Sequence, residues 1–284
     1  SIYLDKKLET LLLHITKYRS REGWTHANML SLCHVKADSP ERNLILHYAV
    51  KGEIEELGAD ATPELRSIHE RLTRINDLIH MGEDRGAAAV VAMIKEDKMI
   101  CREHLPSWSL KKPSVLKILL PQMPLGALLR NLSNLTKNGA LGPLSDEEQT
   151  VVDKFGNVEA LKRSLLHPIQ IMVASTMYKS GPNYSQRVVR ALDKAFYDSF
   201  ANVKPTGKRH VLCYDVSTSM SWGGGMCNCP TLTPRVMSAA LGMVTLRTEP
   251  KCHTMAFSDT FVPLGLSPDD SLEATITKVS GLAF

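Results

Sequence analysis

Apolar residues recur at helical spacing from the start of the chain to about residue 203. The first stripe contains Leu4, Leu8, Leu11, Leu12 and Ile15, which lie on one face of a helix. Further helices are predicted at residues 25–32, from Ser39, from Pro63, at 86–99, 113–120 and 124–139, from Ser145, and at 168–179 and 185–200. Short polar turns separate these segments, and no stretch between them has a strand pattern. The series is typical of stacked helix pairs that bury their faces against neighbouring pairs. A compact irregular bundle is the alternative.

Several of these helices have recognisable start signals. Thr25 can cap the second segment, and Ser39 stands before a first-turn proline, Pro40. The four residues from Ser145 to Glu148 match a capping box, in which two side chains satisfy each other's backbone N–H groups. We therefore expect these helices to begin close to their cap residues.

The pattern changes at residues 204–208. A short apolar, β-compatible run follows at 210–214, then a glycine-rich loop at 223–225 and a helix at 231–248. Strands are predicted at 252–257 and 261–264, and a last helix at 271–279. Strand, helix, strand and helix in sequence indicate an open α/β sheet. The sequence thus predicts two domains, a helical one at 1–203 and an α/β one at 204–284.

Hard oxygen ligands directly follow the first predicted strand. Asp215, Ser217 and Ser219 lie at its carboxyl end, where open α/β sheets place their ligand sites. A carboxylate and two hydroxyls suit Mg²⁺, which retains some of its waters. The alternative is that Asp215 only caps the following turn, because Asp and Ser are common there. Cys227 and Cys229 have no second pair of ligands and fall short of a zinc pattern.

A basic and aromatic cluster lies near the N-terminus. Lys17, Arg19 and Arg21 end the first helix, and Trp24, His26, His34 and Lys36 follow. Lys17 and Arg21 would share a helical face if the helix continued that far. Arg and Lys can pair with phosphates, and His can stack on or bond to unpaired bases. The alternative is a solvated helix end, since the helix dipole alone favours cations there. Trp24 is interpreted as a core residue rather than as a stacking platform.

Composition narrows the class of protein. Hydrophobic residues make up 43% of the chain and charged residues 23%, and the net charge is only +4. This charge permits nucleic-acid binding without arguing for it. No apolar run is long enough for a membrane span. The six cysteines have no secreted framework and no signal peptide is recognisable, so we expect free thiols in the cytoplasm, with the nucleus as an alternative.

The sequence gives little support to an enzyme. Lys208 is not part of a P-loop, because Asn202 stands where its first glycine would be. His69 and Glu70 lack the second histidine of a zinc protease, since Thr73 occupies that position. No Gly-x-Ser-x-Gly elbow occurs. We therefore expect a binding protein.

Several long strings together resemble one family. They are residues 16–26, 32–36, 123–132, 167–168, 178–179, 191–197 and 205–209, the motif at 215–220, and 256–259. In this order they resemble the Ro ribonucleoprotein family, whose helical ring is called the TROVE module. The motif at Asp215, Ser217 and Ser219 also resembles the metal-ion-dependent adhesion site of von Willebrand A domains. The similarity spans nearly the whole chain.

The resemblance implies both a fold and a function. The fold would be a ring of HEAT-like helical repeats, of which this chain is a segment, closed against a truncated von Willebrand A domain of Rossmann-like form. The function would be binding of small non-coding Y RNA and of the single-stranded 3′ ends of misfolded RNA, for RNA quality control. Lys17, Arg21 and His34 match positions that the family uses for Y RNA, and Arg19, His26 and Lys36 lie nearby. A divalent cation, Mg²⁺, is the implied cofactor.

The chain differs from the family pattern in two respects, and two alternative functions remain open. The family's N-terminal helices and its later metal-ligand loops are not in this chain, so we expect a fragment with an incomplete metal site, and residues 221–230 differ from the family in composition. The main rival is a protein-interaction scaffold whose A domain captures an acidic partner through Mg²⁺. A telomerase-associated protein with a TROVE module is a narrower rival.

Overall fold

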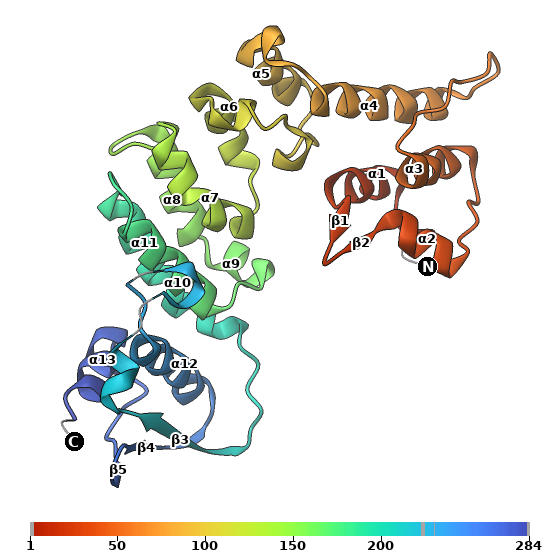
Figure 1. Cartoon of the computed structure of the whole chain (residues 1–284). Coiled ribbons are helices and arrows are strands. Elements are labelled where there is room, and N and C mark those ends of the chain that lie inside the picture. The colour runs from red at the N-terminus through yellow and green to blue at the C-terminus, as the bar shows by residue number, and fades with distance from the viewer. Residues whose placement is uncertain (1–2, 223–224, 230, 283–284) are drawn as a thin grey trace. The chain divides into compact units, whose positions relative to one another are not determined.

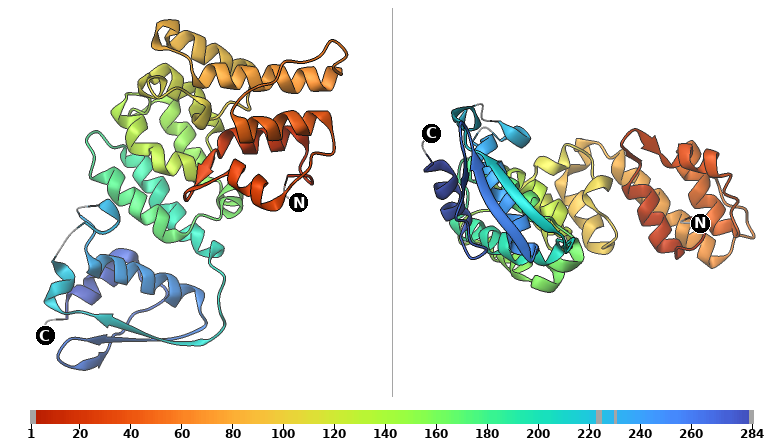
Figure 2. Two further views of the ribbon diagram at one scale, coloured as in Figure 1. Left: turned by 45° about the vertical axis from the view of Figure 1, so that its right-hand side comes forward. Right: turned by 90° about the horizontal axis from the view of Figure 1, so that it is seen from below.

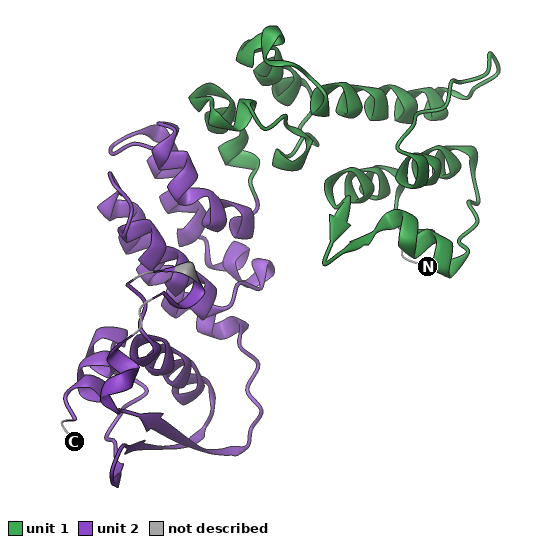
Figure 3. Ribbon diagram, viewed as in Figure 1, with its two compact units in different colours: residues 1–123 green, residues 124–284 purple. Residues whose placement is uncertain are grey.

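The computed structural model describes residues 3–222, 225–229 and 231–282. The chain divides into two compact units, residues 1–123 and residues 124–284 (Figure 3). Most elements of both units are helices; a two-stranded hairpin lies in the first unit, and a three-stranded sheet lies near the C-terminal end (Figure 1). A helical array followed by a small α/β domain is therefore confirmed. No helix within the described residues has both the length and the apolar character that a membrane crossing requires.

Within the described residues, the first unit contains six α-helices and one short hairpin. Its core contains Leu11, Leu12, Ile45 and Leu72, which are fully buried. The helix α1 packs against α3, and α2 packs against α3 as well. The elements are α1 (Leu8–Lys17), β1 (Ser20–Arg21), β2 (Trp24–Thr25), α2 (His26–Cys33), α3 (Pro40–Lys51), α4 (Pro63–Ile79), α5 (Gly86–Glu96) and α6 (Pro113–Leu119) (Figure 1).

The second unit continues with helices before the sheet begins. They are α7 (Leu125–Lys137), α8 (Asp146–Gly156), α9 (Val158–Ser164), α10 (Pro168–Lys179) and α11 (Gln186–Asp198). The α/β part consists of β3 (Arg209–Asp215), α12 (Pro234–Thr248), β4 (Lys251–Phe257), β5 (Phe261–Pro263) and α13 (Leu272–Ser280). The three predicted strands and both predicted helices of this part are confirmed. The seven-residue α9, capped by Asn157, was not predicted, because it spans only two turns and shows no clear period.

The capping predictions hold at two sites and fail in part at a third. The Thr25 and Ser39 side chains accept hydrogen bonds from the backbone N–H groups of Asn28 and Arg42. Ser145 likewise accepts from the N–H of Glu148, but the Glu148 carboxylate does not return to Ser145. It accepts instead from the N–H of Leu144, at 3.1 Å. Glu148 also bonds Ser185 and Arg187, so its side chain serves helix packing and not a reciprocal cap.

The sheet is small and covered by helices on one face. Strand β3 runs parallel to β4, with Arg209 opposite Lys251 and Asp215 opposite Phe257. Strand β5 pairs antiparallel with β4. Figure 2 shows α12 and α13 together over the same face of the sheet, and Tyr214, Ala239, Ala256 and Val279 form the core between them. The opposite face of β3 is open, and Val211 on it is 62% exposed.

The chain between α11 and β3 is tied firmly to the α/β part. The Glu249 carboxylate accepts hydrogen bonds from the backbone N–H groups of Thr206 and Gly207, at 2.6 and 2.9 Å. These bonds hold the pKa of Glu249 below its usual range. The change of sequence pattern at residues 204–208 therefore coincides with an extended connector, and compact packing continues across it within the second unit.

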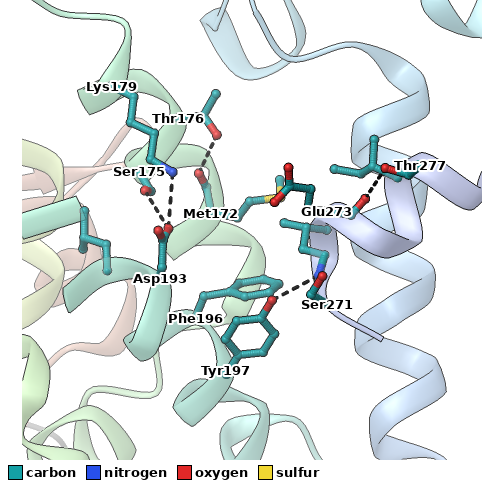
Figure 4. Close-up of a pocket in the computed structure, with 13 residues that line it drawn as sticks. Met172, Ser175, Thr176, Lys179, Asp193, Phe196, Tyr197, Ser271, Glu273 and Thr277 are labelled. Atoms are coloured by element: carbon teal, nitrogen blue, oxygen red, sulfur yellow. Dashed lines mark hydrogen bonds and ion pairs between the residues drawn. The ribbon is translucent and has the colours of Figure 1, made fainter. Parts of the chain in front are cut away.

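A cavity of about 430 Å³ lies in the second unit between α10, α11 and α13. In Figure 4 the carboxylate of Asp193 lies between Ser175 and Lys179, and an ion pair of 3.4 Å joins Asp193 to Lys179. Tyr197, also on α11, accepts the N–H of Leu272 with its hydroxyl at 3.1 Å (Figure 4). This bond joins α11 to the start of α13 in the α/β part, and the ion pair of Asp193 with Lys179 joins α11 to α10.

Candidate nucleic-acid interface and metal motif

The basic cluster is arranged by a tight hairpin that follows α1. Lys17 is the last residue of the helix, and Arg21 lies on β1, which pairs with Trp24 on β2. The two residues between the strands, Glu22 and Gly23, both have positive φ, +51° and +81°. Positive φ at both central residues is the mark of a type I′ turn, whose twist matches that of paired strands. The hairpin thus carries Arg21 away from the helix axis.

The predicted shared helical face of Lys17 and Arg21 is therefore wrong. The helix ends at Lys17 because Tyr18 leaves helical geometry, with φ −109° and ψ 57°. The Tyr18 N–H still donates to the His14 carbonyl oxygen, at 3.0 Å. The hairpin was also missed, because strands of two residues are too short to alternate. Gly23, which directly follows the polar residues from Ser20 to Glu22, was the available signal, because glycine adopts positive φ without strain.

His34 and Lys36 lie where α2 ends. His34 caps the C-terminus of α2 in the left-handed conformation, with φ 48° and ψ 42°. Its side chain and that of Lys36 are both exposed. Few residues other than glycine and asparagine adopt this backbone conformation without cost. The sequence therefore holds a histidine at a strained, exposed position where a glycine would fit better.

Arg19 and His26 have partners within the fold. The Arg19 Nη2 donates to the Tyr48 hydroxyl at 3.1 Å, and the Tyr3 hydroxyl lies 3.0 Å from Nδ1 of His26. Burial lowers the pKa of His26 and outweighs the effect of nearby backbone carbonyls that favour the proton. His26 is therefore a neutral ring at neutral pH and not a phosphate-binding cation. Its contribution to a nucleic-acid surface would be stacking or hydrogen bonding.

The other cations of the cluster are not neutralised by acidic side chains. Over the described ranges of the chain, no carboxylate lies within ion-pair distance of Lys17, Arg21 or Lys36. The ammonium of Lys17 lies 5.2 Å from the centre of the Tyr18 ring, a cation–π contact that leaves its positive charge in place. The end of α1, the hairpin and the end of α2 thus present uncompensated positive charge.

The three oxygen donors of the metal motif lie at the carboxyl end of β3. Asp215 ends the strand, and its Oδ1 accepts the N–H of Ser217 at 2.9 Å. The hydroxyl oxygens of Ser217 and Ser219 are 3.0 Å apart. The hydrogen bonds from Ser217 lower the pKa of Asp215, with a smaller contribution from Arg235. Asp215 therefore caps the turn, as one interpretation expected, and the hydroxyl groups of Ser217 and Ser219 lie close to each other.

Arg235 supports this loop from α12. Its Nη2 donates to the carbonyl oxygens of Val216 and Ser217, at 2.9 Å each. Within the parts of the chain that the structure describes, no cluster of three or more His, Cys, Asp or Glu side chains has metal-binding geometry. One carboxylate and two hydroxyls suit a hard cation that keeps water ligands, and they form only part of a coordination shell.

The two neighbouring cysteines do not form a thiolate pair. Cys229 is fully buried, and its sulfur lies 3.4 Å from the hydroxyl of Thr231. Cys227 is exposed on the other side of a short turn. All six cysteines of the chain are free thiols, as expected. Gly223, Gly224 and Pro230 of the glycine-rich stretch lie outside the described residues.

The family models and the relatives that match this chain are all of the Ro type. The TROVE domain model matches residues 3–184, and the Ro60 vWA domain model matches residues 209–284. The chain is 33% identical over 293 residues to the RNA-binding protein RO60 of Deinococcus radiodurans, covering all of this chain and 53% of the relative. It is 28% identical over 329 residues to the RNA-binding protein RO60 of Caenorhabditis elegans, covering 99% of this chain and 50% of that relative.

A solved structure supports the same relationship. The crystal structure of the Deinococcus radiodurans RO (RSR) protein superposes with a TM-score of 0.77 at 34% identity. The superposition covers 98% of this chain and 55% of the crystallised one. The chain therefore spans about half the length of the relatives that it matches.

Proposed function

Because this chain belongs to the TROVE family of Ro-type proteins, we propose that it binds structured small non-coding RNA through the surface at the ends of α1 and α2. The relatives are named RNA-binding proteins, and an RNA partner is the premise that the family supplies. The observation that carries the proposal is the uncompensated charge of Lys17, Arg21 and Lys36, together with the exposed His34 at the C-terminus of α2.

The contacts of each residue indicate its role in RNA binding. Lys17 and Arg21 supply phosphate contacts, which hold an RNA without reading its sequence. His34 and Lys36 extend the surface along the exit of α2. Arg19 is restrained by Tyr48, and His26 by Tyr3, so these two position the surface more than they attract phosphate. Y RNA is the specific partner that the family resemblance suggests. Capture of misfolded RNA by its 3′ end, for quality control in the cytoplasm or nucleus, is part of the same proposal.

The metal motif has a separate proposed role. Asp215, Ser217 and Ser219 supply three oxygens for Mg²⁺, and ligands from elsewhere would complete the shell. Such an ion would favour an acidic group of a protein partner. This is the scaffold alternative, and the close approach of the two hydroxyls supports it.

The salt dependence of binding and the effect of a chelator distinguish RNA binding from metal-dependent binding of a protein partner. Each phosphate contact that is lost should flatten the slope of log affinity against log salt by about one. We expect the triple replacement of Lys17, Arg21 and His34 by alanine to weaken binding of a small structured RNA by more than tenfold at low salt and to flatten this slope. A chelator should leave RNA affinity unchanged, because none of the oxygen donors of the metal motif belongs to the basic surface.

A matched control is available on α9. Lys162 and Arg163 are both exposed, and replacing them by alanine removes the same two permanent charges. This double variant should bind RNA nearly as the parent chain does. Equal losses in the two variants would show that net charge alone drives binding, and no loss in the triple variant would refute the proposed surface.

A further inference from the structure

The interpretation of Trp24 as a core residue is wrong, because its side chain is 55% exposed. Pairing of Arg21 with Trp24 in the hairpin directs the indole outward at the edge of a cavity of about 450 Å³. Four further aromatic or imidazole rings line this cavity, those of Tyr3, His14, Tyr18 and His26. Its volume falls in the range of about 300–1,000 Å³ that is typical of small-ligand sites.

We propose that this cavity receives one unpaired nucleobase, stacked on Trp24, while Arg21 contacts the adjoining phosphate. The inference rests on the proposed RNA-binding function and adds to it a subsite for unpaired bases. Every base has a π-face, so stacking on an aromatic side chain tolerates any sequence. The occupant is therefore an RNA strand with at least one base that is free of pairing.

The arrangement of the rings supports a flat occupant. The rings of His14 and Tyr18 lie 5.1 Å apart at 59°, and those of Tyr3 and His26 lie 5.8 Å apart at 79°. Tyr3 and His26 therefore meet edge to face, His14 and Tyr18 are tilted, and each of these four rings already contacts another ring. Trp24 is in no such pair among the described residues, which leaves a large indole face for a ligand.

Charge at the cavity favours an anionic ligand. Arg21 lines the rim, and the ammonium of Lys17 lies against the Tyr18 ring. None of the lining residues is an aspartate or glutamate. A nucleotide combines an aromatic face with a phosphate at its edge, and the cavity offers a complement to both. An acidic peptide would use the charge but would leave the indole without a flat partner.

The floor of the cavity also has unused hydrogen-bonding capacity. Within the described residues, Nδ1 of His14 is buried and has no hydrogen-bond partner. Buried polar atoms without partners are rare in native proteins. The ring of His14 lines the cavity, and burial lowers the pKa of His14, so its neutral ring carries one donor and one acceptor.

The test compares two single strands of equal charge on the full chain. One probe is a twelve-nucleotide oligoadenylate, and the other is an abasic ribose-phosphate strand of the same length. Stacking of one base on an aromatic side chain changes affinity by about fivefold to a hundredfold. We therefore expect the oligoadenylate to bind at least about fivefold more tightly. Replacement W24A should abolish this difference, and W24F should retain most of it.

The outcomes separate this inference from the proposed function on which it rests. Equal affinity for both probes, or a base preference that W24A leaves intact, overturns the base subsite. The triple variant at Lys17, Arg21 and His34 should weaken both probes, and its failure to do so would overturn the phosphate surface instead. Because Trp24 is mostly exposed, W24A should keep the parent's circular dichroism, which confirms that a lost preference is not lost folding.

Discussion

Arg247 on α12 lies over the ring of Tyr197 on α11, with 4.9 Å between the guanidinium carbon and the ring centre. The same guanidinium lies 5.4 Å from the centre of the Phe200 ring. Its Nη2 donates to the carbonyl oxygen of Asp270 at 2.7 Å, just before α13 begins. This side chain thus links the last long helix of the array to the α/β part, and it is one of the contacts across residue 204 within the second compact unit.

Replacing Arg247 by alanine should destabilise the second unit by about 2 kcal/mol, because a partly desolvated cation–π contact and a charged hydrogen bond are lost together. Lysine should restore only part of this, since an ammonium cannot stack its plane on the rings. Urea unfolding measures the change as a lower midpoint. Arg163→Ala on the exposed face of α9 is the control, with an expected change within about 0.5 kcal/mol. Equal urea midpoints for R247A and R163A would show that the contacts of Arg247 contribute nothing to stability.

The sequence predicted elements best where local signals agreed. The helix at 168–179 was predicted at its observed bounds, because Pro168 fits the first helical turn and Gly181 follows the end. The sheet strands were found because they are apolar and bounded by turns. The hairpin after α1 was missed, since its backbone is set by two positive φ values and not by any period. Trp24 was misplaced, because residue type alone does not tell which side of a hairpin an aromatic ring occupies.

The candidate sites were predictable as residue sets but not as geometries. The sequence singled out Lys17, Arg21 and His34 on charge and resemblance, and the structure adds that they lie on three different elements. The sequence could not reveal that Arg19 and His26 form hydrogen bonds with tyrosines from elsewhere in the chain. Such long-range pairs depend on helix packing, which local sequence patterns do not encode.

A buried hydroxyl in the α/β part predicts a stabilising substitution. The Tyr214 side chain is 3% exposed, and within the described residues its hydroxyl has no hydrogen-bond partner. Burial raises the pKa of Tyr214 to about 12. A hydroxyl that loses water and gains no partner costs about 1–3 kcal/mol. Tyr214→Phe should therefore raise the free energy of unfolding by about 1 kcal/mol.

The matched control is Tyr178, which is also buried. Its hydroxyl accepts the N–H of Ser185 at 3.0 Å, so Tyr178→Phe should cost about 1 kcal/mol. Gly242 tests the same site from the other side, because a Cβ there would overlap the Tyr214 ring. G242A should destabilise by about 1–3 kcal/mol through overpacking. A loss of stability in Y214F similar to that in Y178F would show that the Tyr214 hydroxyl has a partner after all.

His34, the cap residue that follows α2, allows RNA binding to be separated from stability. His34 has φ 48°, where a residue with a Cβ is strained by roughly 1–2 kcal/mol. His34→Gly should keep or raise the thermal midpoint, because glycine adopts this backbone without strain. The same variant should weaken RNA binding, because the imidazole is lost. H34A retains the strain and removes the ring, so its RNA affinity should match that of H34G. Full RNA affinity in H34G would remove His34 from the proposed surface.

A buried carboxylate should make the second unit sensitive to acid. Glu148 is 1% exposed. It accepts hydrogen bonds from the Ser185 hydroxyl, the Leu144 N–H and Arg187. Burial alone raises the pKa of Glu148, but these hydrogen bonds and the charge of Arg187 outweigh it, and the net pKa is lowered. The stabilisation is therefore present above the unfolded pKa of about 4.3 and is lost as pH falls through the lower folded value.

Replacing Glu148 by alanine should destabilise the second unit by about 3 kcal/mol at neutral pH, because Arg187 and Ser185 lose their buried acceptor. The difference between E148A and the parent should shrink as the pH falls below about 4, where the parent's carboxylate takes up its proton. Glu159→Ala removes an exposed carboxylate paired with Lys162 and should cost less than about 0.5 kcal/mol at any pH. Urea midpoints measured from pH 3 to pH 7 check this. A difference between E148A and the parent that stays constant over this range would show that packing, and not the ionised carboxylate, is what Glu148 contributes.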